Sequence, residues 1–318
     1  MEIGVIGCGR WGSFLAWYAA RNHRVTIYGR ADSARFCDLR KTRKNGYVTL
    51  PESVAFTDDL AAVLGADLIL VSVAAQHLRE LCLDIKKTDA HHGKTLVLCM
   101  KGIEKKSGLR LTEVVADVLG NDVHTAIWVG PGHPQDFTAG VPNCMVIDSA
   151  EEDVKRRVVA ALQGDLIRFY RGTDIIGNEI GAAAKNIIGI AAGLLDGMGK
   201  TALKGALMSR GTREIARLIA ALGGEELSAY GLAHLGDYEA TVFSPYSHNR
   251  RYGELLAKGE PYGELAEGAE SVDAVCMLGE KVGVELPICR AVKAIIDGDI
   301  TPADAMGELF LRSLKDEF

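Results

Sequence analysis

Paired or clustered cysteines are absent from this sequence. Its seven cysteines form no CxxC pair, and together with the eight histidines they show none of the short spacings that zinc sites use. The sequence therefore predicts neither a disulfide framework nor a metal site. Free thiols of this kind are typical of a reducing cytoplasm. We interpret Cys8, which lies between two glycines, as a small turn residue rather than a redox thiol.

An excess of positive charge and a long hydrophobic segment are also lacking. Lysine and arginine number 36 against 42 acidic residues, and the resulting net charge of −6 argues against a nucleic-acid partner. A local basic pocket for phosphorylated metabolites is compatible with that total. The apolar run of residues 68–75 is far shorter than the roughly 20 residues that cross a bilayer, so we expect no membrane-spanning helix. The chain enters a strand-like segment without a basic leader, and we expect no signal peptide.

What the chain does contain is enough apolar sequence for two cores. Its 318 residues are 48% hydrophobic and 25% charged, which is typical of a globular protein with two domains. Strand-like runs lie at 2–7, 24–28, 53–56, 67–73, 94–99, 123–128, 142–147 and 165–170. Helical patterns lie between them at 11–21, 31–43, 58–64, 75–87, 109–119 and 149–163, the last opening with a capping box at residues 149–152. This alternation predicts an α/β, Rossmann-like fold with a doubly wound, mostly parallel sheet over residues 1–172.

Residues 173–318 are predicted to form an all-helical domain that carries substrate-binding and catalytic groups. The alternation stops near residue 172, and alanine, glycine, leucine and isoleucine then recur at spacings of three and four. Glycines at 177, 181, 189 and 193 favour close helix packing. No Pro/Ser linker separates the halves, so we expect a tight interface between them. A helical second half also leads us to expect a homodimer.

Three glycines follow the first strand-like segment with the spacing Gly7-x-Gly9-x-x-Gly12. In the dinucleotide fingerprint the first makes the tight turn, the second lets the backbone approach a pyrophosphate, and the third lets helix pack on strand. Such triplets also occur in ordinary loops. The order here is strand, turn and helix, which points first-turn N–H groups and the helix dipole at one anion site. We therefore predict a dinucleotide site.

The second strand-like run ends without the acidic residue that normally binds the ribose of NAD. Arg30 stands there instead, after Tyr28 and Gly29. A guanidinium at this place can bind a 2′-phosphate through charge-assisted hydrogen bonds, which favours NADP over NAD. The alternative is a solvated arginine that stacks on adenine, and this is compatible with NAD as well.

Lys101 and Gly130-Pro131-Gly132 each follow a strand-like run. In open α/β sheets, ligands bind beyond the carboxyl ends of the strands. Lys101 at that edge would attract an anionic or carbonyl substrate, and the glycine turn would allow close approach. The alternative for Lys101 is an ordinary solvated lysine.

Lys185 stands in a helical stretch made mainly of alanine, glycine and isoleucine, with Asn186 beside it. Burying an ammonium there without a purpose would be costly. Desolvation lowers a lysine pKa by up to about 3–5 units, which suits a proton donor or acceptor near neutral pH. The alternative is a structural lysine that extends along the helix to solvent.

Residues 237–251 concentrate hydroxyl, amide and guanidinium groups of the kind that bind phosphate. The members are Asp237, Thr241, Ser244, Ser247, His248, Asn249, Arg250 and Arg251. A polar surface loop is the alternative. His248 is either a proton donor or a neutral hydrogen-bonding group.

Taken in order along the chain, these stretches resemble the NAD(P)-dependent glycerol-3-phosphate dehydrogenases of the bacterial cytosolic type. The shared elements are the turn at 7–12, Lys101-Gly102, Gly130-Pro131, residues 174–186, Ser209–Gly211, Gly236-Asp237, Thr241, Ser247–Gly253, Glu267-Gly268 and residues 284–288. The resemblance covers nearly the whole chain. It implies hydride transfer between the nicotinamide and C2 of dihydroxyacetone phosphate or sn-glycerol 3-phosphate, a reaction of glycerophospholipid metabolism.

The resemblance also implies roles for single residues. Lys185 corresponds to the family's proton donor or acceptor, and we group it with Lys101 and Asp237 as catalytic. The implied cofactor contacts are Gly7, Gly9, Arg10, Trp11, Gly12, Arg30, Lys101, Pro134, Arg250 and Glu267. The implied substrate contacts are Lys101, Gly130, Gly132, Lys185, Asn186, Asp237, Thr241, Ser247, His248 and Asn249.

Three departures from the family pattern fall at the substrate and cofactor positions. His248 stands where the family has an arginine expected to meet phosphate, and Arg250 or Arg251 is the candidate replacement. Gly132 replaces a serine, and Ala202 replaces an asparagine. These changes support an alternative, a related dehydrogenase for another small phosphorylated or carboxylated 2-hydroxy or 2-keto compound. A cofactor-binding sensor without catalysis is a third hypothesis, but it does not require Lys185, Asp237 and Asn249 together.

Overall fold

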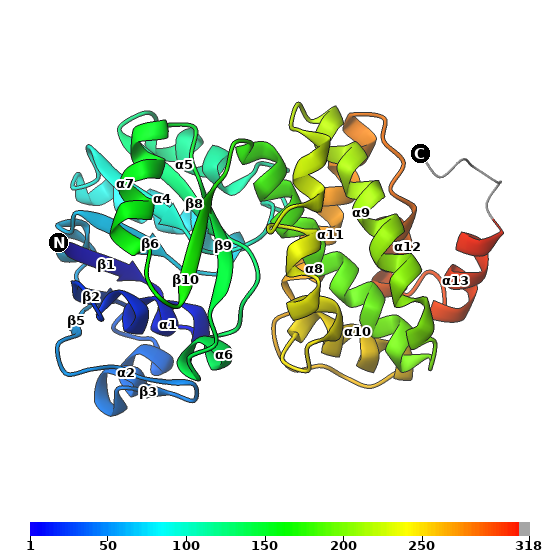
Figure 1. The fold of residues 1–318 in the computed structure, drawn as a ribbon, viewed down its shortest axis with the longest axis horizontal. Helices are drawn as coiled ribbons and strands as arrows, with labels where there is room; N and C mark the ends of the chain where they lie inside the picture. Colours follow the sequence, from blue (N-terminus) through cyan, green and yellow to red (C-terminus); the bar gives the residue numbers. More distant parts are fainter. Residues whose placement is uncertain (312–318) are drawn as a thin grey trace.

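An eight-stranded sheet forms the first half of the protein, as the computed structural model of residues 1–311 shows (Figure 1). Its strands are β1 (Glu2–Ile6), β2 (Arg24–Tyr28), β5 (Ala55–Thr57), β6 (Leu68–Val71), β7 (Lys94–Leu98), β8 (Val123–Val129), β9 (Asn143–Asp148) and β10 (Ile167–Arg171). They run in the order β10-β9-β8-β7-β6-β1-β2-β5. β8 and β9 pair antiparallel and the other neighbours pair parallel, which confirms the predicted mostly parallel sheet.

Helices cover both faces of this sheet because its strands are apolar on both sides. In β1, Ile3 and Val5 enter one core and Ile6 enters the other. The first core contains side chains of α1 (Arg10–Ala19), α2 (Ala34–Thr42), α6 (Pro134–Thr138) and α7 (Glu152–Leu162). The second contains side chains of α3 (Leu60–Leu64), α4 (Leu78–Thr88) and α5 (Leu111–Leu119). This layered arrangement is that of a Rossmann-like domain.

Local details of the first half differ from the prediction. The capping box at residues 149–152 is wrong, because α7 begins after Glu151 without a side-chain cap. Ser149 Oγ instead donates to the Thr125 carbonyl at 2.6 Å and accepts from the Glu151 N–H at 3.1 Å, so it joins the helix entrance to β8. The short helix α6 and the hairpin β3–β4 (Lys44–Asn45, Val48–Thr49) were not predicted, since the helix has only 5 residues and each strand of the hairpin only 2.

The second half contains helices without strands over the described residues 173–311, as predicted. The long helices are α8 (Ile175–Gly197), α9 (Lys204–Ala221), α10 (His248–Lys258), α11 (Glu267–Lys281), α12 (Pro287–Asp297) and α13 (Pro302–Phe310). Short helical turns are η2 (Thr201–Leu203), η3 (Glu226–Tyr230), η4 (Leu235–Asp237) and the π-helical η5 (Glu239–Phe243). Glycines confirm their packing role: a Cβ on Gly193 would overlap the Arg250 carbonyl of α10, and one on Gly189 would meet Thr241.

Helix α8 lies at the centre of the second half, where it packs against α10, α11 and α9 (Figure 1). It is long and apolar enough to cross a membrane, but 83% of the relevant window is buried inside the protein, as in the core helix of a globular fold. Its first turns join the two halves. Glu179 accepts hydrogen bonds from the Thr112 N–H at 3.0 Å and from Arg110 Nη1 at 2.6 Å, and Asn178 donates to Asp148 at 2.8 Å. The interface is therefore tight and polar, while the division at residues 172 and 173 stays a prediction.

Candidate active site

Lys185 is buried in the middle of α8 and points toward the loop that follows α9. Its side chain is 10% exposed, and Nζ donates to Thr241 Oγ1 at 2.7 Å. The same ammonium lies 3.1 Å from Asp237 Oδ2. Thr241 Oγ1 in turn donates to the Asp237 carbonyl at 2.7 Å, so η4 and η5 present both oxygens to one ammonium. The lysine is not the solvent-directed structural side chain that was the alternative.

Lys101 approaches the same carboxylate from the sheet. It follows β7, and its Nζ lies 2.5 Å from Asp237 Oδ2 and 2.9 Å from the Gly130 carbonyl, which follows β8. The Asp237 side chain is only 2% exposed, and its Oδ2 pairs with the ammonium groups of both Lys101 and Lys185. Two ammonium groups therefore face the Asp237 carboxylate at the carboxyl edge of the sheet, with the buried Glu267 carboxyl close enough for its pKa to respond to both. Such a site attracts an anionic substrate and stabilises a developing alkoxide.

Burial tunes the proton affinities of this group. It lowers the pKa of Lys185 to about 8; the charge of Asp237 opposes that shift, and the charge of Lys101 adds to it. Burial likewise lowers the pKa of His133, with a further contribution from the charge of Lys185. For Glu267, burial raises the carboxyl pKa although Lys185 and Lys101 act against it. An amine with a pKa near neutrality is suited to both donating and accepting a proton.

Amide side chains attach the neighbouring helices to this centre. Asn186 Nδ2 donates to Glu267 Oε2 at 3.2 Å, and Asn249 Oδ1 accepts from the Gly268 N–H at 2.8 Å. Ser247 Oγ caps α10 by accepting from the Arg250 N–H. The structure thus brings α8, α10 and α11 together at these polar residues, while their contact with a substrate stays a prediction.

The glycine turn has the shape that a dinucleotide needs. Gly7 has φ +115°, and a Cβ there would overlap the carbonyl of Ser72, the residue after the neighbouring strand β6. A Cβ on Gly12 would overlap the Gly7 carbonyl. A Cβ on Gly9, in contrast, would meet only Arg35 Nη1 at 3.9 Å, so the turn is open beside the first N–H groups of α1. This bare cradle at a helix N-terminus fits a diphosphate.

A Gly12→Ala substitution is expected to weaken cofactor binding strongly. The added methyl group overlaps the Gly7 carbonyl, so α1 must move away from β1 and the cradle must open. Binding of NADH and NADPH, measured by fluorescence titration, is expected to weaken at least about 100-fold. Gly205→Ala, on α9 with no atom near the new Cβ, is the matched control. Normal cofactor affinity in the Gly12 variant would contradict the assignment of this turn.

The predicted cofactor residues Arg10, Trp11, Arg30 and Pro134 have varied surroundings. Trp11 packs on Phe14 and Trp128 with centroids at 4.8 and 6.3 Å. Arg10 lies over the Tyr47 ring at 5.6 Å, and Pro134 is buried in the first turn of α6. The Arg30 side chain is 77% exposed, and its Nε lies 3.6 Å from Asp32. Gly130 and Gly132 have φ values of +125° and +142°, which explains why side-chain-free residues occupy that turn.

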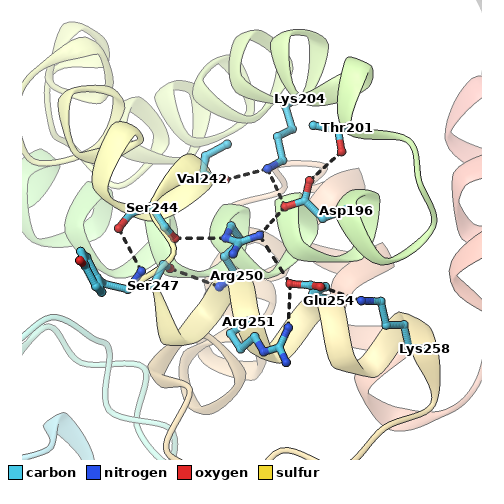
Figure 2. Close-up of polar contacts among 11 residues, drawn as sticks. Asp196, Thr201, Lys204, Val242, Ser244, Ser247, Arg250, Arg251, Glu254 and Lys258 are labelled. Atoms are coloured by element: carbon cyan, nitrogen blue, oxygen red, sulfur yellow. Dashed lines mark hydrogen bonds and ion pairs between the residues drawn. The ribbon is translucent and has the colours of Figure 1, made fainter.

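Arg250 has a different partner from the one expected. Its Nη1 lies 2.7 Å from Asp196 on α8, and its Nε donates to the Ser244 carbonyl at 3.1 Å, as Figure 2 shows. Arg251 pairs with Glu254 at 3.1 Å. Both guanidinium groups therefore have partners within the helical half, and a contact of Arg250 or Arg251 with phosphate or cofactor stays a prediction.

His248 itself is half-buried at the start of α10. Its Nδ1 lies 2.5 Å from the Tyr262 hydroxyl and 3.3 Å from Glu264. Burial lowers its pKa, and the charge of Arg10 adds to that effect, which places Arg10 and His248 in one electrostatic environment across the two halves.

Some residues near the site were not predicted. His133 Nε2 lies 3.0 Å from the Ala240 carbonyl, beside the Thr241 turn, and Arg35 borders Gly9. No spacing signal marks either residue, because each reaches the site through a loop or a helix face. The structure also brings His91, His92 and Asp122 within 4.8 Å of one another, a group with metal-ligand chemistry that the sequence spacing did not indicate. It lies at the amino ends of β7 and β8, opposite Lys101, and plays no part in the arrangement around Lys185.

The fold and this site together define the class of protein: a two-domain, nicotinamide-dependent dehydrogenase with a lysine-centred site between a Rossmann-like sheet and a helical domain. Family models described as the N-terminus and the C-terminus of NAD-dependent glycerol-3-phosphate dehydrogenase match residues 2–155 and 174–307. The chain belongs to this family.

Relatives match along the whole length. Glycerol-3-phosphate dehydrogenase [NAD(P)+] of Bradyrhizobium sp. (strain ORS 278) is 39% identical over 99% of this chain and 98% of its own. The enzyme of the same name from Dechloromonas aromatica is 37% identical, covering 100% and 99%. The crystal structure of glycerol-3-phosphate dehydrogenase from Coxiella burnetii superposes with a TM-score of 0.91 at 30% identity, covering 98% and 99%.

Proposed function

We propose that this protein transfers a hydride between NAD(P)H and C2 of dihydroxyacetone phosphate, and in reverse oxidises sn-glycerol 3-phosphate. The observation that carries the proposal is the buried ammonium of Lys185, which contacts Thr241 and Asp237 at the carboxyl edge of the sheet. The names of the full-length relatives support the substrate. They favour it over another 2-keto compound, and over a sensor without catalysis.

Lys185 acts as the acid in the reducing direction. When bound, the nicotinamide cofactor supplies the hydride to C2 of the substrate. The Lys185 ammonium gives its proton to the oxygen on C2, which leaves a neutral amine and an alcohol; the amine regains a proton from water. In the oxidising direction the neutral amine takes the hydroxyl proton. General acid–base catalysis of this kind contributes about 10²–10⁴ in rate.

The other predicted residues bind and orient. Asp237 keeps Lys185 and Lys101 close, and Thr241 directs the ammonium. Lys101 lies within reach of the substrate oxygens at the Gly130 turn. We assign Ser247, His248 and Asn249 to the substrate's phosphate end, and a placement there is supported by the start of α10, where N–H groups favour anions.

The cradle of the glycine turn and the residues around it are assigned to NAD or NADP. Arg30 still favours NADP, and Arg35 beside Gly9 adds a second guanidinium that suits a 2′-phosphate. The seven cysteines are free, which supports the expected cytoplasmic location. The homodimer stays a prediction.

Turnover with the named substrate is the direct test. Purified protein mixed with dihydroxyacetone phosphate is expected to consume NADPH, NADH or both, followed by absorbance at the nicotinamide band. Dihydroxyacetone without the phosphate serves as the control and is expected to react poorly, because binding energy from the remote phosphate contributes to the transition state. If neither reduced cofactor is consumed, the substrate assignment is wrong; turnover of a different 2-keto compound would then favour the alternative.

A further inference from the structure

We propose that Asp196 is a positioning residue for Lys185, because it anchors two cations that hold the backbone immediately after Thr241. The inference rests on the proposed function of Lys185. No hydrogen bond or ion pair joins Asp196 to Lys185 or Thr241; it acts through Lys204 and Arg250.

Asp196 lies in the last turn of α8 and has a side chain only 13% exposed. Its Oδ2 is 2.6 Å from Lys204 Nζ and 2.7 Å from Arg250 Nη1 (Figure 2). Its other oxygen, Oδ1, accepts from Thr201 Oγ1 at 2.9 Å. One carboxylate thus joins the end of α8, the turn η2, the start of α9 and the start of α10.

Each of the two cations also holds one backbone carbonyl of the Thr241 segment. Lys204 Nζ donates to the Val242 carbonyl at 2.9 Å, and Arg250 Nε donates to the Ser244 carbonyl at 3.1 Å. Both carbonyls belong to the end of η5 and the residue after it. We call this arrangement of Asp196, Lys204 and Arg250 the carboxylate clamp.

The clamped segment is one that needs support. η5 is a π-helical turn, a conformation that is rare and occurs mostly at functional sites. Thr241 lies inside it, against Gly189 of α8, and donates to Asp237 while accepting from Lys185. Holding the carbonyls at 242 and 244 therefore fixes where the Thr241 hydroxyl meets the Lys185 ammonium.

The charge of Asp196 is as important as its shape. Burial alone would disfavour its ionised form, but hydrogen bonds from Lys204 and Arg250 outweigh that effect and lower its pKa. The carboxylate thus stays ionised and compensates the two cations. Without it, two poorly solvated cations would face each other, with Glu254 at 3.6 Å from Arg250 as the remaining acidic group nearby.

The test is Asp196→Asn, which keeps size and an acceptor but removes the charge. With dihydroxyacetone phosphate and a saturating reduced cofactor, kcat is expected to fall about 10- to 100-fold, as for a small misplacement of a catalytic group. The KM for the cofactor is expected to stay unchanged, since the glycine turn is remote. A looser turn admits water to Lys185, so its pKa rises from about 8 and the alkaline limb of ketone reduction moves to higher pH.

Glu254→Gln is the matched control, because Glu254 pairs with Arg251 and Lys258, lies 3.6 Å from Arg250 against 2.7 Å for Asp196, and is not a partner of Lys204 in the described part of the chain. It is expected to keep the native kcat and pH profile. A native kcat and pH profile in Asp196→Asn would overturn the proposal. Should that variant not fold, Lys204→Met removes the contacts of Lys204 with Val242 and Asp196 and leaves Arg250 on the Ser244 carbonyl. It is expected to shift the alkaline limb in the same direction, and an unshifted limb would overturn the proposal.

The Lys185→Ala variant separates this inference from the proposed function. If it retains full turnover, the role of Lys185 is wrong, whatever Asp196→Asn does. If it loses turnover while Asp196→Asn keeps the native profile, only the clamp is wrong.

Discussion

A Lys185→Ala variant is expected to lose about 10²–10⁴ in kcat while it binds NADH and NADPH as the native protein does. The reason is the proposed role of the buried Lys185 as proton donor to the reacting oxygen, whereas the glycine turn proposed to bind the cofactor lies in the other half. Steady-state turnover and cofactor fluorescence titration measure the two quantities separately. Retained turnover would assign the proton transfer to another group.

The pH dependence of the native enzyme gives the same residue a second signature. Ketone reduction needs the ammonium form, which is present below the pKa of about 8, so the rate is expected to fall as pH rises through that value. Alcohol oxidation needs the neutral amine, so its rate is expected to rise over the same range. If the rate of the Lys185→Ala variant still changes with pH near 8, the titration belongs to a different group.

Lys155 provides a matched control for burial. Its side chain is 7% exposed, and Nζ binds the Gly172 carbonyl and Asp148 far from the cofactor turn. Lys155→Ala is expected to lower the free energy of unfolding, by the loss of a buried partner, and to leave kcat of the folded enzyme unchanged. The side chains of Lys155 and Lys185 are buried to a similar extent, at 7% and 10% exposed. A difference in kcat between the two variants therefore reports on function rather than on burial.

Asp237→Asn is expected to have the second large effect. The substitution leaves Lys101 and Lys185 without the carboxylate they share, at 2.5 and 3.1 Å. Breaking a buried pair of this kind destabilises by about 3–5 kcal/mol, and the displaced ammonium lowers kcat/KM by about 100-fold or more. Chemical denaturation and steady-state kinetics measure both quantities.

The pH profile of Asp237→Asn distinguishes charge loss from simple loosening. The Asp237 charge raises the pKa of Lys185, so its removal lowers that pKa below about 8 and moves the alkaline limb of ketone reduction to lower pH. This direction is opposite to the one expected for Asp196→Asn. An unchanged limb would show that the Asp237 charge does not act on the titrating group.

Much of the fold could be predicted from local patterns. Alternating apolar runs predicted the strands of the main sheet to within two or three residues, and the spacing of glycines predicted the close contact of α8 with its neighbours. These features depend on residues near each other in the chain. Short elements such as α6 and β3–β4 were missed because a single helical turn or a strand of two residues is too short to show a periodic pattern of apolar residues.

The site could be predicted only in part. The turn at Gly7, the buried Lys185 and the family pattern predicted which residues to consider. They did not predict that Arg250 pairs with Asp196, or that His133 reaches the Ala240 carbonyl. In a sequence, an arginine or histidine that forms a salt bridge looks the same as one that binds a ligand. Only its partners in the folded structure show which role it has.

The sequence by itself determined the class of fold, the anion cradle and the presence of a lysine in an apolar helix, because each follows from neighbours within about a dozen residues. The tertiary structure alone decided how charges are paired. Lys101 meets Asp237 across 136 positions, Lys185 meets Thr241 across 56, and Arg250 meets Asp196 across 54. The Coulomb energy of two charges depends on their distance in space and on their burial, and the order of residues in the chain specifies neither directly.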